Sequence, residues 1–285
     1  MRRYNKYIIK WMKKSKALLT LNEAKLLFTL PKNIPKQGVI VEIGSLKGGS
    51  TILLAKGAKI ANKGRVYSID PYKIYLESGA LKVEPKNALP IFLKNIKDAG
   101  VDDWITQIVK PSLKAAKNWK SQISLLWIDG NHEYENVKTD FLLWEKHLVV
   151  GGIIVFHDSQ ESSAIIPHLK KPHPPIEGPR RFVREYIIKS KRFGNINIVD
   201  SATAAQKIQK ADYKELLMNR LSLPWLKILI MFKSSKKNYK IIYNKFDRKL
   251  GIFGIFLKSN YPKLYFLIKK IKERTKQWKK MKISL

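Results

Sequence analysis

The feature that most constrains this sequence is a run of β-branched residues ending in a glycine-rich turn, V-I-V-E-I-G-S-L-K-G-G-S at 39–50. A helix-like segment, 51–56, follows directly. β-Branched residues favour a buried strand, and glycines allow a sharp turn and close approach of a ligand to the backbone. The unpaired N–H groups of a first helical turn attract a negative group. The pattern predicts a nucleotide-type cradle, with an ordinary strand–turn–helix corner as the plain alternative.

The spacing of the glycines distinguishes between nucleotide ligands. A dinucleotide site has the pattern G-x-G-x-x-G, which seats a pyrophosphate. Here the pattern is E-x-G-x-x-x-G-G-S, with Glu42 inside the strand and only Gly44 before the gap that leads to Gly48. This departure favours S-adenosylmethionine, which has a carboxylate and a ribose but no phosphate, over NAD.

Composition limits the classes of protein that this chain can belong to. It has 285 residues and no cysteine, which excludes disulfides, thiolate metal sites and cysteine nucleophiles and favours a cytoplasmic location. No run approaches the roughly 18 apolar residues of a transmembrane helix, and the N-terminus does not read as a signal peptide. The formal net charge is +34, with the excess in the first ~35 and the last ~75 residues. Attachment to the inner face of an anionic membrane, binding of nucleic acid, or solvated lysines without a partner would each account for it.

Short apolar strands alternate with amphipathic segments through the middle of the chain. We expect strands at 39–44, 65–70, 105–109, 123–129, 152–157 and 196–199, and helices at 50–58, 86–98, 112–119, 134–148 and 179–190. This alternation predicts right-handed βαβ units and a parallel sheet. The turn after the sixth strand is too short for a parallel return, so 204–209 is expected to pair antiparallel. The predicted fold is a doubly wound, mostly parallel, seven-stranded α/β sheet.

The pattern divides the chain into three regions. Residues 1–37 are predicted to be a basic helical extension in which T-L-N-E, beginning at Thr20, forms a capping box. Residues 38–209 form the nucleotide-binding domain, and 210–285 form a second basic helical extension. In that last region one helical face is apolar and flanked by lysines, as in a helix at a membrane interface or a helix packed on its own domain. This face consists of Leu264, Leu267, Ile268 and Ile271.

Polar side chains follow three further predicted strands. Asp70 ends the second strand, at a spacing from the glycine turn that suits an acceptor for both ribose hydroxyls of a nucleoside. Asp129 and His132 follow the fourth strand, and His157 and Asp158 end the fifth. The carboxyl ends of neighbouring parallel strands open onto one crevice, so we expect these four groups to converge beside the nucleoside. They can hold a hard divalent cation, act as base and orienter, or serve only as turn and cap residues.

Taken together, these segments resemble the class I S-adenosylmethionine-dependent methyltransferases. The resemblance is to the group of macrolide-sugar O-methyltransferases and cephalosporin hydroxylase-like proteins (methyltransferase family 24-like), and less closely to catechol O-methyltransferase. It covers about residues 20–209 and rests on the blocks V-E-I-G-S-L-K-G-G-S, V-Y-S-I-D-P, I-D-G-N-H-E-Y-E-N-V and G-G-I-I-V-F-H-D-S. It implies a Rossmann-like fold and methyl transfer to a hydroxyl of a small molecule or a glycan sugar.

Carried over by position, the resemblance also implies roles for single residues. The cofactor would contact Glu42, Gly44, Ser45, Gly48, Ser50, Asp70, Ser112 and Asp129. His132 would be the general base, with Asp129 and His157 as further catalytic residues, and Asp129 and Asp158 would be magnesium ligands. Metal-dependent relatives have an acid or amide pair where this chain has His157 and Asp158. Imidazole is a poor magnesium ligand, so mechanisms with and without the metal stay open, with His157 as a second base or an orienter.

Other functions compete with this interpretation. The charge favours a nucleic-acid methyltransferase, but the fourth strand ends in I-D-G-N-H and lacks the [DN]-P-P-aromatic motif of enzymes that methylate base amines. A nucleic-acid methyltransferase that acts on the ribose is therefore kept as an alternative. A non-catalytic, membrane-associated protein that binds S-adenosylmethionine is the other. The expected partners are thus a small-molecule or glycan acceptor and an anionic membrane met by the basic C-terminal helices, with nucleic acid less favoured.

Overall fold

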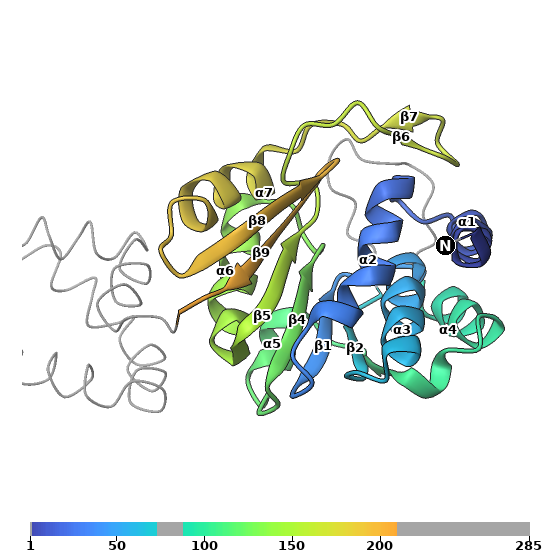
Figure 1. The fold of residues 1–285 in the computed structure, drawn as a ribbon, viewed down its shortest axis with the longest axis horizontal. Helices are drawn as coiled ribbons and strands as arrows, with labels where there is room; N and C mark the ends of the chain where they lie inside the picture. The colour runs from blue at the N-terminus through green and yellow to red at the C-terminus, as the bar shows by residue number, and fades with distance from the viewer. Residues whose placement is uncertain (1, 73–87, 210–285) are drawn as a thin grey trace, which may run out of the picture. The chain divides into compact units, whose positions relative to one another are not determined.

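The computed structural model describes residues 2–72 and 88–209, which fall within one compact unit (Figure 1). The basic C-terminal region predicted at 210–285, with its apolar helical face, lies outside the described residues. In the part of the chain that the structure describes, no helix is long and apolar enough to cross a membrane.

Seven strands form the central sheet in the order β3-β2-β1-β4-β5-β9-β8 (Figure 1). The bounds are β1 (Val39–Ile43), β2 (Val66–Ile69), β3 (Ile105–Ile108), β4 (Ile123–Ile128), β5 (Leu148–Phe156), β8 (Phe193–Val199) and β9 (Ala202–Lys207). Strands β1 to β5 pair in parallel, whereas β9 runs antiparallel to both β5 and β8. The predicted doubly wound, mostly parallel, seven-stranded sheet with an antiparallel return is confirmed.

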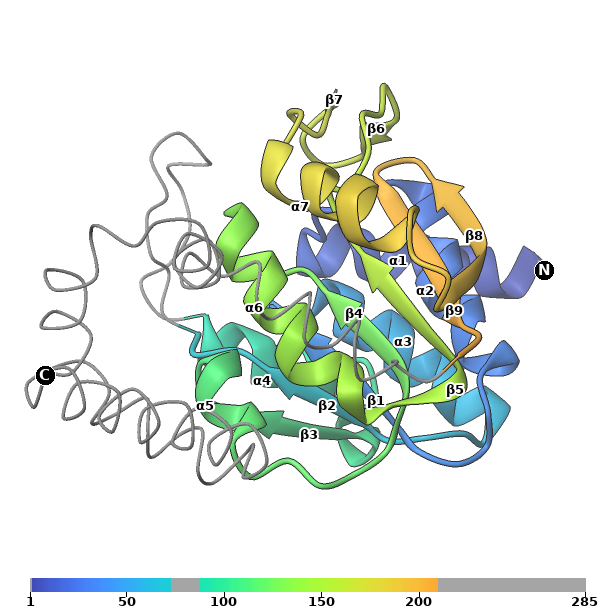
Figure 2. The same ribbon diagram turned by 90° about the vertical axis from the view of Figure 1, so that its left-hand side faces the viewer.

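Helices cover both faces of the sheet (Figures 1 and 2). One face carries α1 (Arg2–Ser15), α2 (Leu21–Asn33), α3 (Gly49–Ala61) and α4 (Leu89–Asp98), and the other carries α5 (Ser112–Ala116), α6 (Tyr134–Trp144) and α7 (Glu177–Phe182). Buried side chains on each side form a separate hydrophobic core, as a two-faced parallel sheet requires. A small hairpin, β6 (Ile165–Ile166) and β7 (Lys171–Pro172), completes the regular structure.

Some boundaries differ from the sequence prediction. Strand β5 begins at Leu148 and not at residue 152, because the glycines at 151 and 152 lie inside the strand, where the pairing register with β4 shifts. The helix predicted at 134–148 ends at Trp144 and is followed by a 3₁₀ turn, Glu145–His147. The last predicted helix is α7 continued by a π-helical turn, Val183–Ile187. Single-sequence patterns locate elements better than their ends, since tertiary pairing sets where a strand starts.

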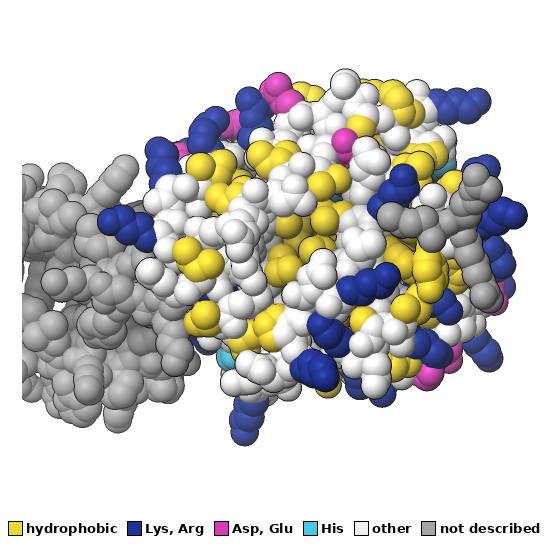
Figure 3. Space-filling view, in the orientation of Figure 1, with side chains coloured by type: hydrophobic (Ala, Val, Ile, Leu, Met, Phe, Trp, Pro, Cys, Tyr) yellow, Lys and Arg dark blue, Asp and Glu magenta, His cyan; other side chains and the backbone are white. Residues whose placement is uncertain are grey.

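The N-terminal region, set apart by its charge in the sequence, is packed into the domain. The capping box at Thr20 and Glu23 forms as predicted, and α2 continues past Pro31 to Asn33. Trp11 of α1 is buried in the same core as α3 and the sheet. On the face of the described residues seen in Figure 3, lysines and arginines far outnumber the acidic side chains, although Lys138, Arg192 and Lys207 are buried. The described residues 2–37 are therefore packed into the same compact unit as the sheet.

Candidate functional site

A cavity of about 320 Å³ opens at the carboxyl ends of the parallel strands. It lies where β1 and β4 are neighbours, the point at which the strand order reverses and where open α/β sheets bind ligands. The volume is near the lower end of the range for small-molecule sites. Of the predicted site residues, Gly44, Ser45, Ser50, Asp70, Ser112, Asp129, His132, His157 and Asp158 line it. Glu42 and Gly48 do not.

The turn between β1 and α3 is built for close approach. Gly44 has φ +84°, and a Cβ at this position would lie 2.0 Å from the carbonyl oxygen of Asp129. Gly48, also at positive φ, precedes α3, and no side chain caps the first turn of this helix. The N–H groups of that turn are therefore available to a negatively charged group of a ligand.

Glu42 supports this turn from inside the sheet. Its carboxylate accepts hydrogen bonds from the hydroxyls of Ser45, at 2.8 Å, and of Thr51. Burial raises the pKa of Glu42 to about 7 against the opposing effect of the neighbouring hydroxyls. The structure thus places Glu42, which the resemblance assigned to cofactor contact, behind the cavity wall and in contact with Ser45, which itself lines the cavity.

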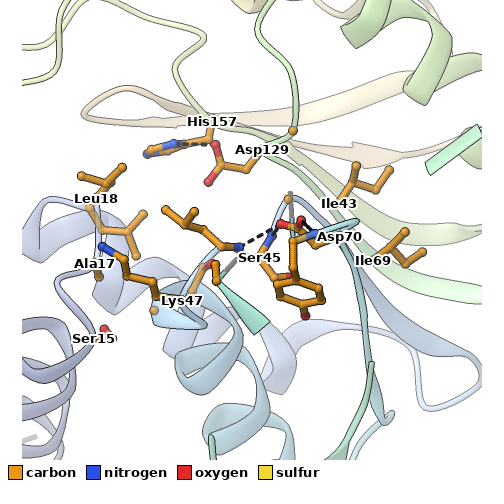
Figure 4. Close-up of a pocket in the computed structure, with 18 of the residues that line it drawn as sticks. Ser15, Ala17, Leu18, Ile43, Ser45, Lys47, Ile69, Asp70, Asp129 and His157 are labelled. Carbon is orange, nitrogen blue, oxygen red and sulfur yellow. Dashed lines mark hydrogen bonds and ion pairs between the residues drawn. The ribbon is translucent and has the colours of Figure 1, made fainter. Parts of the chain in front are cut away.

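Asp70 joins the end of β2 to the same turn. Its Oδ2 accepts hydrogen bonds from the backbone N–H groups of Ser45, at 2.8 Å, and Leu46, at 2.9 Å (Figure 4). Its Oδ1 accepts a hydrogen bond from the N–H of Tyr72. The side chain is half-buried and at the cavity wall, where sequence spacing placed an acceptor for ribose hydroxyls.

Ser112, expected near an adenine, opens α5 and directs its hydroxyl toward α6. The hydroxyl donates to Asp140 Oδ1 at 2.6 Å and accepts from the Trp144 indole N–H at 2.8 Å. Neither Asp140 nor Trp144 was predicted from the sequence, because helix α6 carries no motif that marks them.

The structure brings together the four polar groups at the ends of β4 and β5. Nε2 of His132 lies 3.3 Å from Asp158 Oδ2 and 3.6 Å from Asp129 Oδ1. Nδ1 of His157 lies 3.0 Å from Asp129 Oδ1. Burial lowers the pKa of His132, but the nearby negative charges of Asp129 and Asp158 more than reverse this effect and raise it above 6.5.

His157 lies between two carboxylates. Opposite Asp129, its Nε2 is 3.4 Å from Oε2 of Glu23, and the ring is almost fully buried. A neutral imidazole has one N–H, and both partners are acceptors, so this geometry favours the doubly protonated ring. Burial lowers the pKa of His157, but the charges of Asp129 and Asp158 hold it well above its usual value. The arrangement favours the orienter role for His157 over that of a second base.

Two further residues, Glu23 and His173, belong to this cluster. Glu23 was visible only as part of a capping box, yet its Oε1 also accepts hydrogen bonds from the backbone N–H and hydroxyl of Ser201. His173 lies 3.2 Å from Asp158 Oδ1 and donates from Nε2 to the carbonyl oxygen of Leu18 at 2.8 Å. The segment 15–19 also lines the cavity, so the N-terminal region forms part of its wall. The composition of this region did not predict that role.

The cluster contains donor atoms for a cation. One ligand atom each from Asp129, His132 and Asp158 lies within 4.8 Å of the others. Nε2 of His132 is buried, and no described group forms a hydrogen bond with it. Two carboxylates and one imidazole suit a divalent transition metal better than magnesium, which prefers oxygen ligands. The residues present thus fit a divalent cation, but they fit magnesium less well than an all-oxygen set would.

Comparison with known proteins identifies a related domain. Residues 41–159 match a family model described as a methyltransferase domain. The uncharacterized protein R132 of Acanthamoeba polyphaga mimivirus is 34% identical over 139 residues, which cover 46% of this chain and 57% of that protein. The chain therefore spans little more than half the length of that relative.

Solved structures share the fold. The O-methyltransferase NovP superposes with a TM-score of 0.52 at 13% identity, over 66% of this chain and 81% of its own. The SAH-bound methyltransferase PaMTH1 of Podospora anserina gives 0.50 at 14% identity, over 71% of this chain and 88% of its own. At these identities the likeness is one of architecture.

Proposed function

We propose that this chain is a class I, S-adenosylmethionine-dependent methyltransferase that transfers the methyl group to a hydroxyl of a small molecule or of a glycan sugar. One observation carries the proposal: a single cavity contains the glycine turn, Asp70 and an imidazole flanked by two carboxylates. The description of NovP as an O-methyltransferase and the SAH bound to PaMTH1 support the same chemistry.

The cofactor is proposed to lie along the carboxyl ends of β1 and β2. The open first turn of α3 suits the carboxylate of the methionine part, next to Gly44, Ser45 and Ser50. Asp70, at the end of β2, is available to the ribose hydroxyls. A side chain at residue 44 would occupy the space that the backbone of this turn and the end of β4 now share.

His132 is proposed to remove the proton of the acceptor. A sulfonium is a good methyl donor, so the protein has to align the donor carbon with the acceptor oxygen and take up the proton. Bound in this cavity, the cofactor would supply the methyl group and become the thioether, and His132 would take up the hydroxyl proton of the acceptor. Asp129 and Asp158 stabilise the resulting imidazolium. His157 holds Asp129 in place from the other side.

A divalent cation is the alternative means of activating the hydroxyl. Asp129 and Asp158, joined by His132, would hold it, and it would lower the pKa of the acceptor hydroxyl. The resemblance implies such a mechanism, with magnesium as the cation. The acceptor side of the cavity, lined by Ala17, Leu18 and His173, is the same in either case.

The net charge of +34 favours a second candidate, a ribose-directed nucleic-acid methyltransferase. The same charge supports our proposal that the protein associates with an anionic membrane surface on the cytoplasmic side. The nucleic-acid candidate and the membrane proposal differ in the acceptor that the enzyme would meet. The proposed role of His132 as the base is the same in each.

Transfer of a labelled methyl group to a panel of sugars, catechols and RNA tests the assignment. We expect a hydroxylated small molecule or sugar to be labelled, and His132→Ala to reduce the rate by roughly 10²- to 10⁴-fold while the affinity for S-adenosylhomocysteine stays within about threefold. Because the base must be neutral and its pKa is raised, the rate should rise with pH through an inflection above 6.5.

Labelling of RNA alone would favour the second candidate. An undiminished rate in His132→Ala would contradict the role of this residue, and a requirement for added Mg²⁺ that Asp158→Ala abolishes would favour the metal.

A further inference from the structure

Part of the cavity wall is apolar. Ile43 and Ile69, at the ends of β1 and β2, line the side away from His157 and Leu18 (Figure 4). Both isoleucines belong to the core that packs against α5 and α6. Ser112 adjoins them in the cavity wall, and directly behind it lies Asp140 of α6, whose exposed fraction is 8%.

One carboxylate oxygen of Asp140, Oδ2, accepts no hydrogen bond from the described residues. Ser112 gives its only proton to Oδ1, and the indole N–H of Trp144 is donated to Ser112. None of the described residues donates to Oδ2 of Asp140. This oxygen is not completely enclosed by the protein, so a donor that reaches it can form a hydrogen bond with it.

Oδ2 lies next to the cavity. A Cβ added to Gly130, which lines the cavity, would be 3.5 Å from this oxygen and 3.3 Å from the side chain of Ile43. Gly130 has no side chain, so the space between the cavity and Asp140 is left clear. A ligand that meets this part of the wall encounters apolar surface and, at its edge, one oxygen that only accepts hydrogen bonds.

We propose that Asp140 determines base specificity: its Oδ2 accepts a hydrogen bond from the exocyclic amine of the adenine of S-adenosylmethionine. The proposal rests on the proposed function, because it assumes that cofactor. The apolar surface of Ile43 and Ile69 suits the faces of a planar base, and the amine is the donor at its edge. A base with a carbonyl oxygen or a hydrogen at that position would offer Oδ2 no donor, and the site would lose the free energy of that hydrogen bond.

The test compares two ligands on the full chain by calorimetry at pH 8. The first is S-adenosylhomocysteine, and the second is its analogue with hydrogen in place of the 6-amino group. Burial raises the pKa of Asp140 to about 6, so the carboxylate is ionised at pH 8. We expect the wild type to prefer the amine by at least about tenfold, Asp140→Leu to lose most of that preference, and Asp140→Asn to retain part of it through its amide oxygen.

Thr139→Ala is the matched control, because Thr139 is the exposed neighbour of Asp140 on α6, and it should keep the preference for the amine. Equal weakening of both ligands in Asp140→Leu would overturn the proposal and assign Asp140 a structural role. So would a wild type that binds the two ligands equally well. A wild type that binds neither ligand would overturn the proposed function itself, and this inference with it.

Discussion

At the scale of single residues, Gly44 shows how one position determines the shape of the cavity. It combines a left-handed backbone with a distance of 2.0 Å between any added Cβ and the carbonyl oxygen of Asp129. The backbone at Gly44 thus lies against the end of β4, the strand end that carries the acid–imidazole cluster. The turn and the cluster are therefore held in register by backbone atoms, which sequence spacing alone can suggest but not measure.

We expect Gly44→Ala to abolish binding of S-adenosylhomocysteine and to lower the stability of the domain, because the ends of β1 and β4 must separate to make room for the alanine side chain. Gly100→Ala is the control, since Gly100 also has positive φ but nothing lies within 4 Å of its added Cβ. It should cost only the backbone strain of about 1–2 kcal/mol. Calorimetry and urea unfolding of the two variants provide the measurement, and equal effects would contradict this account of Gly44.

At the scale of elements, α2 connects the N-terminal region to the site. Glu23 satisfies the backbone N–H of Thr20, binds Ser201 and lies against His157, all with one buried carboxylate. Burial tends to raise the pKa of Glu23, but His157, Ser201 and Thr20 lower it to about 2. Since the folded-state pKa is depressed, this stabilisation is present above the unfolded value near 4.5 and is lost as the pH falls toward 2.

Glu23→Ala should therefore lower the free energy of unfolding at pH 7 by roughly 3–5 kcal/mol, because it leaves the imidazolium of His157 with one partner fewer. The loss relative to wild type should shrink as the pH is lowered below 4.5, the unfolded value. Thr29→Ala, an exposed position on the same helix, should change stability little. Chemical unfolding at several pH values tests this, and a pH-independent difference would show that the charge is not involved.

The elements also show what the sequence could and could not predict. The glycine turn, Asp70 and the polar strand ends of β4 and β5 were predictable because each signal lies within a few residues of a strand. The pairing of Glu23 with His157 spans 134 residues, and that of Ser112 with Asp140 spans 28. Such contacts depend on how α2 and α6 pack, and a single sequence carries no signal for them. The strand start at Leu148 was misplaced for a similar reason, since pairing with β4 sets it.

At the scale of the whole molecule, we expect the positive charge of the C-terminal region to be separable from cofactor binding. Every described element lies within the compact unit Met1–Asp212. We expect a chain that ends at Asp212 to bind S-adenosylhomocysteine as the full chain does but to associate less with anionic liposomes. Vesicle sedimentation at two salt concentrations measures the second effect. Loss of cofactor binding on truncation, or undiminished association with the vesicles, would contradict this division of roles.

The central claim is that the cavity at the ends of β1, β2 and β4 binds the methyl-donor cofactor. Thermal unfolding with and without S-adenosylhomocysteine tests it most directly, on the wild type and on Asp70→Ala. At about 100 times the dissociation constant, the ligand should stabilise the wild type by about 2.7 kcal/mol, a shift of several degrees, and the variant much less. An unchanged melting temperature in the wild type, or an equal shift in Asp70→Ala, would contradict the account.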